Sequence, residues 1–204
     1  MTKLPNLLTG LRLVLALFTF FGLAAAALLS DTLTPADQFA LERWAFVAFV
    51  VAAITDFFDG WLARKLDAMT VWGAILDPIA DKVLVCGAIL GLLSLSPNAA
   101  VAIPAALILF REFTVSALRE VAAGKGISLP VTLLAKWKTT LQLVALGAEL
   151  LVACWGAFAL PSDPAVLGPA TTGAHALLWL AALITLITGA QYWRQARKAL
   201  NQSA

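Results

Sequence analysis

Four aspartates stand close together in a sequence that is apolar almost everywhere else. They are Asp56, Asp59, Asp77 and Asp81, and they lie at the facing ends of two successive apolar runs. An ionised carboxylate at membrane depth is costly unless it faces a polar cavity or a cation. Four carboxylates at the same depth also repel one another unless positive charge lies between them. The group therefore predicts a metal site.

The spacing of the aspartates places them on two helix faces. Asp56 and Asp59 are three residues apart, and Asp77 and Asp81 are four apart, so each pair shares one face of a helix. Hard oxygen ligands favour Mg²⁺ or Mn²⁺, and a Mg²⁺ ion bound by few carboxylates usually completes its shell with water and substrate phosphate. The small residues on the same faces, which leave room for such a substrate, are Gly60, Ala63 and Gly73.

A purely structural alternative is that basic side chains pair with the aspartates. Arg64 and Lys82 are the nearest cations in the sequence. Two cations do not neutralise four clustered acids, so the metal interpretation is favoured.

The composition shows which elements must position these residues. Of 204 residues, 61% are hydrophobic and only 13% are charged, with a net charge of +2. Soluble domains are typically about a quarter charged, and disordered chains are less apolar still, so both classes are excluded. Apolar runs bounded by charges, Pro or Gly predict an all-α, polytopic membrane protein with six transmembrane helices in one domain, 1–204. The expected spans are roughly 11–29, 39–66, 71–95, 101–122, 131–158 and 174–200.

The distribution of Lys and Arg predicts the orientation of this bundle. With six spans both termini lie on one side, and nearly all basic residues fall on that side or in the adjoining helix halves. The positive-inside rule makes this side cytoplasmic. The aspartates then face the cytoplasm, and 161–173 is expected to be an external loop.

A second group of charges follows on the next two predicted helices. Arg111 and Arg119 are eight residues apart on the fourth, and Lys136 and Lys138 lie at the start of the fifth. A guanidinium fork suits phosphate oxygens, so this group predicts a site for a phosphorylated substrate. The alternative for Arg111 is an ion pair with Glu112 or with an aspartate of the metal site. The alternative for Arg119 and Lys138, and to a lesser extent for Lys136, is that they are simple positive-inside residues.

The aspartate pattern resembles a known family signature. The run Asp56-Phe-Phe-Asp59-Gly60-Trp-Leu-Ala63-Arg64, followed after eight residues by Gly73-x3-Asp77-x3-Asp81, resembles the signature of the CDP-alcohol phosphatidyltransferases over residues 56–81. Pro5-Asn6-Leu-Leu-Thr9-Gly-Leu-Arg12 is similar to the short N-terminal interfacial segment of these enzymes. Arg111-Glu112, Ser116-Ala-Leu-Arg119-Glu120 and Lys136-Trp-Lys138-Thr139-Thr140 resemble the bacterial members that act on glycerol 3-phosphate.

The resemblance implies a two-metal, usually homodimeric enzyme of the bacterial cytoplasmic membrane. Its substrates would be CDP-diacylglycerol and sn-glycerol 3-phosphate, within a bilayer of membrane lipids, and we expect no nucleic-acid partner. By family pattern Asp56 and Asp77 would contact both ions, Asp59 the first and Asp81 the second. The residues that would bind CDP-diacylglycerol are Asn6, Thr9, Gly60, Ala63, Arg64, Thr70 and Gly73. The acceptor phosphate would be bound by Arg111, Arg119, Lys136 and Lys138.

The chemistry expected from this resemblance is a direct in-line attack. Asp81 would accept the proton of the 1-hydroxyl of glycerol 3-phosphate, and the oxygen would attack the β-phosphorus of CDP-diacylglycerol. Two metal ions neutralise charge on the phosphoryl oxygens in such reactions. The products would be phosphatidylglycerophosphate and CMP.

Two other functions are open from the sequence. The same chemistry could use another acceptor such as inositol phosphate, because the signature defines the donor and not the nucleophile. Intramembrane carboxylates also occur in metal and proton transporters. The aspartates cluster at one depth, however, and apart from Glu149 the external helix halves carry almost no charge, which disfavours a transport path.

Overall fold

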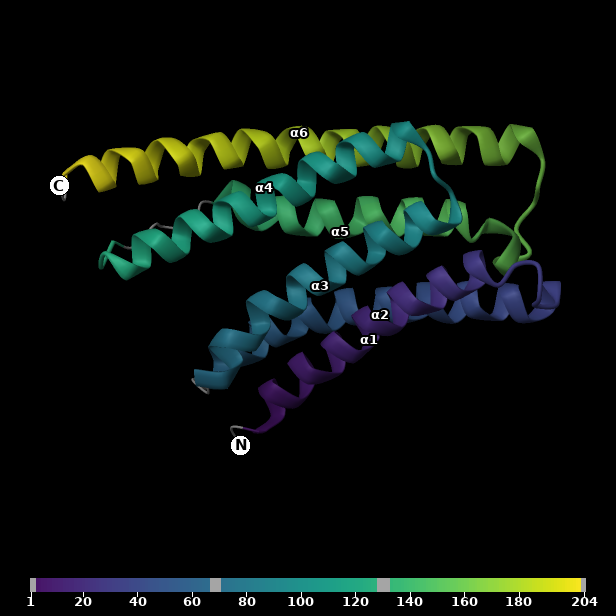
Figure 1. Cartoon of the computed structure of the whole chain (residues 1–204), viewed down its shortest axis with the longest axis horizontal. Helices are drawn as coiled ribbons and strands as arrows, with labels where there is room; N and C mark the ends of the chain where they lie inside the picture. The colour runs from purple at the N-terminus through teal and green to yellow at the C-terminus, as the bar shows by residue number, and fades with distance from the viewer. Residues whose placement is uncertain (1–2, 67–70, 128–132, 203–204) are drawn as a thin grey trace. The chain divides into compact units, whose positions relative to one another are not determined.

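The described part of the chain folds into six α-helices and one short 3₁₀ helix. The computed structural model describes the backbone of residues 3–66, 71–127 and 133–202, and the side chains of 7–56, 73, 75–127 and 137–201. Over this part of the chain the secondary structure is helical with no strand, as the composition predicts. The elements in Figure 1 are α1 (Lys3–Leu28), α2 (Pro35–Leu66), α3 (Val71–Leu95), α4 (Ala99–Gly124), α5 (Leu133–Ala153), η1 (Trp155–Phe158) and α6 (Pro164–Gln202).

Five of the described helices contain a segment long and apolar enough to cross a membrane. The segments are Leu7–Leu28, Pro35–Asp56, Ile75–Leu95, Ala99–Gly124 and Pro164–Asn201. Helix α5 carries Lys136, Lys138 and Glu149 within its 21 residues. The chain is thus an all-α protein with multiple membrane-spanning helices.

Two helices begin earlier than the hydrophobic pattern predicts, because capping residues start them. The Thr34 hydroxyl accepts from the backbone N–H of Asp37 at 3.2 Å, and α2 begins at Pro35 rather than at residue 39. Asp163 accepts from the backbone N–H of Ala165 at 2.9 Å, and α6 begins at Pro164. Proline at the first helical position after a capping side chain is a common helix start. The prediction that 161–173 is a loop is therefore wrong for most of that segment.

Other boundaries also differ from the prediction. Helix α1 runs without a break from Lys3, so the expected interfacial segment is continuous with the first span. Helix α5 ends at Ala153, and the following residues form η1, which is followed by Ala159 in the left-handed conformation (φ 50°).

Helix α4 ends in a Schellman motif at Gly126. Gly126 has φ +73°, a conformation that glycine adopts without steric cost. Its N–H donates to the Ala123 carbonyl, and the N–H of Ile127 donates to the Ala122 carbonyl, both at 2.9 Å. This pairing is the Schellman pattern, in which two carbonyls of the last turn gain donors.

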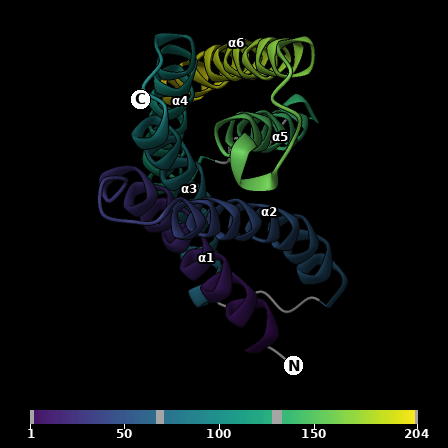
Figure 2. The ribbon, with the colours of Figure 1, turned by 90° about the vertical axis from the view of Figure 1, so that its right-hand side faces the viewer.

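The helices group into two compact units, which we describe separately. The first comprises residues 1–98 and 146–171, and the second comprises 99–145 and 172–204. In the first unit α1 packs along both α2 and α3, as Figures 1 and 2 show from two sides. A β-carbon on Gly87 of α3 would lie 3.0 Å from the Ala16 carbonyl oxygen of α1. The absence of a side chain at Gly87 therefore permits close approach of α1 and α3.

In the second unit α4 and α6 pack through a small apolar cluster. Val115 and Ala122 of α4 are buried together with Tyr192 and Ala196 of α6, and Ile127 packs against them. This contact orients the face of α4 that carries Arg111 toward α6.

Candidate active site

A buried arginine of α1 connects two of the predicted metal ligands. The Nη1 of Arg12 lies 2.8 Å from Oδ1 of Asp56 on α2 and 2.6 Å from Oδ1 of Asp81 on α3. Arg12 is only 1% exposed, whereas the side chains of Asp56 and Asp81 are 26% and 49% exposed. Three helices thus bring two carboxylates to one positive group, with the carboxylates open to solvent and the arginine enclosed.

A third predicted ligand is held by the same helix. The Thr9 hydroxyl of α1 donates a hydrogen bond to Oδ1 of Asp77 at 2.6 Å, and Thr9 is buried. Thr9 and Arg12 are three residues apart and therefore lie on the same face of α1. That face contacts aspartates from both α2 and α3.

The described residues of this group fit a divalent cation. Asp56 and Asp81 already converge on one cationic nitrogen, and carboxylate oxygens are the ligands that Mg²⁺ and Mn²⁺ prefer. Within the described side chains, no group of three or more acidic, His or Cys residues gathers around a single point. The hydrogen bond from Thr9 occupies one oxygen of Asp77.

The remaining residues of the predicted donor and metal sites divide into two groups. Gly73 is buried on α3. The others lie outside the described side chains, and the predictions for them stay predictions: Asn6, Asp59, Gly60, Ala63, Arg64, Thr70 and, from the acceptor group, Lys136.

In the second unit two of the predicted phosphate-binding cations meet at one carboxylate. Glu112 Oε1 accepts from Arg111 Nη1 at 3.2 Å and from Lys138 Nζ in a short contact. The side chains of Arg111 and Lys138 are 7% and 5% exposed, and that of Glu112 is 23% exposed. Helices α4 and α5 are therefore joined by a cluster of two cations and one anion, which carries a net positive charge.

Arg111 is held from α6 as well. Its Nη2 donates to the Thr188 hydroxyl at 3.1 Å, and its guanidinium carbon lies 5.7 Å from the centre of the Tyr192 ring. A β-carbon on Gly189 would lie 2.8 Å from Cγ of Arg111, so only glycine leaves room for the arginine stem. The orientation of Arg111 is therefore set by both α4 and α6.

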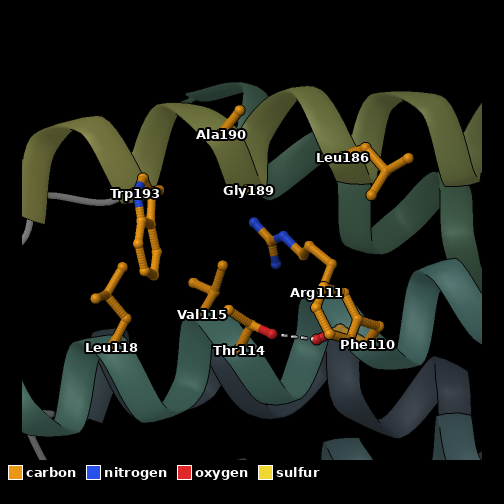
Figure 3. A pocket seen from close by; sticks show the side chains of 9 residues that line it. All are labelled: Phe110, Arg111, Thr114, Val115, Leu118, Leu186, Gly189, Ala190 and Trp193. Carbon is orange, nitrogen blue, oxygen red and sulfur yellow. Dashed lines mark hydrogen bonds between the residues drawn. The ribbon is translucent and has the colours of Figure 1, made fainter.

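Arg111 also lines a small cavity between α4 and α6, shown in Figure 3. The cavity has a volume of about 170 Å³, and its other walls include Phe110, Val115, Leu186 and Trp193. Its lining is almost entirely apolar, and among the residues that the structure describes the buried Nε of Arg111 has no hydrogen-bond partner. An apolar wall lowers the local dielectric beside the guanidinium, which strengthens its interactions with anions.

Arg119 does not join this cluster. It is exposed, and it lies eight residues after Arg111, which is about 12 Å along the axis of α4. The structure thus brings Arg111 and Lys138 together and leaves Arg119 at a separate position on the same helix.

Two residues that organise these groups were not predicted as site residues. The sequence pattern includes Arg12 only within the N-terminal segment, and it offers Glu112 only as an alternative partner of Arg111. A lone arginine inside an apolar run and an acid beside a buried arginine are both intramembrane charges, which is the signal that identifies them. Arg12, which contacts Asp56 and Asp81 in the structure, comes from the first helix, far from both aspartates in the sequence.

The fold and the carboxylate pattern define a class of membrane enzyme, and comparison with known proteins identifies it. The family model described as CDP-alcohol phosphatidyltransferase matches residues 2–187, so the chain belongs to this family. Members of the family generally depend on a metal ion.

Individual relatives resemble the chain over most of its length. A protein of Cereibacter sphaeroides is 40% identical, and the alignment covers 95% of each chain. A protein of Rickettsia bellii is 45% identical over 74% of this chain and 77% of its own, and one of Bacillus subtilis is 37% identical over 77% and 75%. All three are named CDP-diacylglycerol–glycerol-3-phosphate 3-phosphatidyltransferase.

Proposed function

We propose that the chain transfers the phosphatidyl group of CDP-diacylglycerol to sn-glycerol 3-phosphate, with release of CMP. The observation that carries this proposal is the meeting of Asp56, Asp77 and Asp81 with one face of α1, in a chain of this family. The names of the relatives support the choice of acceptor. The reaction is part of phospholipid synthesis, and we place it at the cytoplasmic face of a bacterial inner membrane.

We propose that Asp56, Asp59, Asp77 and Asp81 hold two divalent ions, Mg²⁺ or Mn²⁺. When bound, such ions neutralise charge on the phosphoryl oxygens and on the leaving CMP. Thr9 orients Asp77 through its hydrogen bond, and Gly73 keeps the face of α3 beside the aspartates free of side chains. We assign recognition of the nucleotide donor to Asn6, Thr9, Gly60, Ala63, Arg64, Thr70 and Gly73.

We assign the role of general base to Asp81. Its carboxylate is the more exposed of the two that contact Arg12, so an acceptor hydroxyl arriving from solvent can reach it. Asp81 takes the proton of the 1-hydroxyl, the oxygen attacks the β-phosphorus, and the bond to CMP breaks. General-base catalysis typically contributes about 10²–10⁴-fold in rate. Full turnover by Asp81→Asn with unchanged substrate binding would rule out this role.

The acceptor phosphate is assigned to Arg111, Arg119, Lys136 and Lys138. The net positive cluster formed by Arg111 and Lys138 around Glu112 supports this assignment, because buried cations with excess positive charge attract a phosphate dianion. A phosphorylated acceptor is also favoured over an uncharged one by the same excess of charge.

The proposed enzyme acts as a homodimer.

The experiment that tests the function is an acceptor panel. The purified protein is incubated in detergent with CDP-diacylglycerol, Mg²⁺ or Mn²⁺, and one of glycerol 3-phosphate, inositol phosphate or serine, and the release of CMP is measured. We expect CMP with glycerol 3-phosphate and none after chelation of the metal. Release with inositol phosphate alone would reassign the acceptor, and no CMP with any acceptor would refute the enzyme and favour a transporter.

A further inference from the structure

The contact of Arg12 with both aspartates has a consequence for metal binding. An arginine stays protonated in proteins, so its positive charge is permanent. Nη1 of Arg12 is in hydrogen-bond contact with one oxygen each of Asp56 and Asp81. Without that charge two carboxylates from different helices would face each other at short range and repel. Arg12 therefore supplies positive charge between the two carboxylates in this structure.

A cation shared by both carboxylates would also lie close to these two oxygens. A Mg²⁺ ion binds carboxylate oxygens at about 2.0–2.1 Å. Nη1 lies 2.8 and 2.6 Å from one oxygen of each carboxylate, so an ion that takes up the position between these two oxygens displaces the nitrogen. Arg12 and a metal ion reach the carboxylate oxygens from different sides. Arg12 is enclosed on the side of α1, whereas the carboxylates are exposed to the solvent from which an ion arrives.

We infer that Arg12 is a built-in counter-cation that exchanges with a divalent metal ion at Asp56 and Asp81. This inference rests on the proposed function, which makes these aspartates metal ligands. In the metal-free protein Arg12 holds α1, α2 and α3 together at the site. When metal binds, Nη1 withdraws from at least one of the two oxygens. Arg12 is thus a positioning residue that weakens metal binding while it stabilises the empty site.

The test measures Mn²⁺ binding to the detergent-solubilised full chain by isothermal titration calorimetry. In Arg12→Gln the competing charge is removed, and we expect Mn²⁺ to bind at least about tenfold more tightly than to the wild type, which corresponds to about 1.4 kcal/mol. In Arg12→Lys the charge remains, but a lysine lacks the fork that reaches both oxygens. We therefore expect its Mn²⁺ affinity to lie between that of the wild type and that of Arg12→Gln. Arg43→Gln is the matched control. Arg43 lies in the same unit, donates from Nε to the Ala157 carbonyl at 2.9 Å, and is expected to leave Mn²⁺ affinity unchanged.

Thermal unfolding gives a second measurement. Without metal, Arg12→Gln should melt below the wild type, because two facing carboxylates lose their cation. Saturating Mn²⁺ should raise its melting temperature by more than it raises that of the wild type, because binding energy adds to stability. A merely structural role for Arg12 would lower the melting temperature equally with and without Mn²⁺.

The outcomes separate this inference from the proposed function. Tighter Mn²⁺ binding by Arg12→Lys supports exchange even if Arg12→Gln does not fold. If the wild type binds Mn²⁺ and both folded variants bind it with equal or weaker affinity, the exchange is overturned and the enzyme assignment stays intact. If the wild type binds no Mn²⁺, or if Asp81→Asn binds it as well as the wild type, the metal-ligand assignment itself fails.

Discussion

Glu112 joins α4 to α5, and its removal tests the structure of the acceptor group. The substitution Glu112→Gln keeps the size and shape of the side chain and removes its negative charge. Arg111 and Lys138 both contact Oε1 of Glu112 and are almost fully buried, so the variant leaves two like charges without their anion. The change should therefore destabilise the protein.

The size of the effect follows from burial. Removing one partner of a buried ion pair costs about 3–5 kcal/mol. Because 23% of the Glu112 side chain is exposed, water compensates part of the loss, and we expect about 2–3 kcal/mol. For a chain of this size each kcal/mol lowers the melting temperature by about 2–4 °C, so the expected fall is about 4–12 °C.

The assay is thermal unfolding in detergent, with a double-mutant cycle. Lys138→Met in the Glu112→Gln background removes one of the two uncompensated cations, so the combined loss should be smaller than the sum of the single losses by at least about 1 kcal/mol. Glu120→Gln, an exposed acid on the same helix, is the control and should change stability by less than about 0.5 kcal/mol. If Glu112→Gln melts with the wild type, or if the two substitutions are additive, the cluster does not carry the energy assigned to it.

Two further changes test the packing and capping of the helices. Gly87→Ala would place a β-carbon 3.0 Å from a backbone oxygen of Ala16, so α1 and α3 must separate, and we expect thermal unfolding to show a loss of about 1–3 kcal/mol in stability. Gly173→Ala is the control, because its β-carbon meets nothing within 4 Å, and it should be neutral or stabilising. Equal melting temperatures for the two variants would contradict the close contact. Asp163→Ala removes the acceptor for the N–H of Ala165, and circular dichroism melts should show a loss of about 1 kcal/mol in the free energy of unfolding. An unchanged melt would mean that α6 does not depend on this cap.

The membrane-spanning helices were predictable because apolar composition and span length are properties of the sequence alone. The start of α2 was misplaced because its first turn, Pro35 to Gln38, is polar, and that of α6 because Gly168, Pro169 and Gly173 interrupt the apolar run near its beginning. Thr34-Pro35 and Asp163-Pro164 carry that information instead, as a capping side chain followed by a proline. The end of α4 was similarly set by Gly126, four residues beyond the last residue of the predicted span.

The candidate site was predictable where its residues lie on one helix face. The i, i+4 spacing by itself places Asp77 and Asp81 on one face of α3. The partner of Asp81 comes from α1, 69 residues earlier, and periodicity within a helix contains no information on which helix packs against it. Glu112 was ambiguous for the same reason, because its second cation, Lys138, comes from α5.

We propose that this chain joins glycerol 3-phosphate to the phosphatidyl group of CDP-diacylglycerol. The most direct test is to supply labelled glycerol 3-phosphate with CDP-diacylglycerol and Mg²⁺ or Mn²⁺ to the purified protein, and to measure label in the lipid phase together with CMP. We predict equal amounts of labelled phosphatidylglycerophosphate and CMP, and neither product from Asp77→Asn, which has lost a proposed ligand of both ions. CMP without labelled lipid, or labelled lipid formed equally well by Asp77→Asn, would contradict this claim.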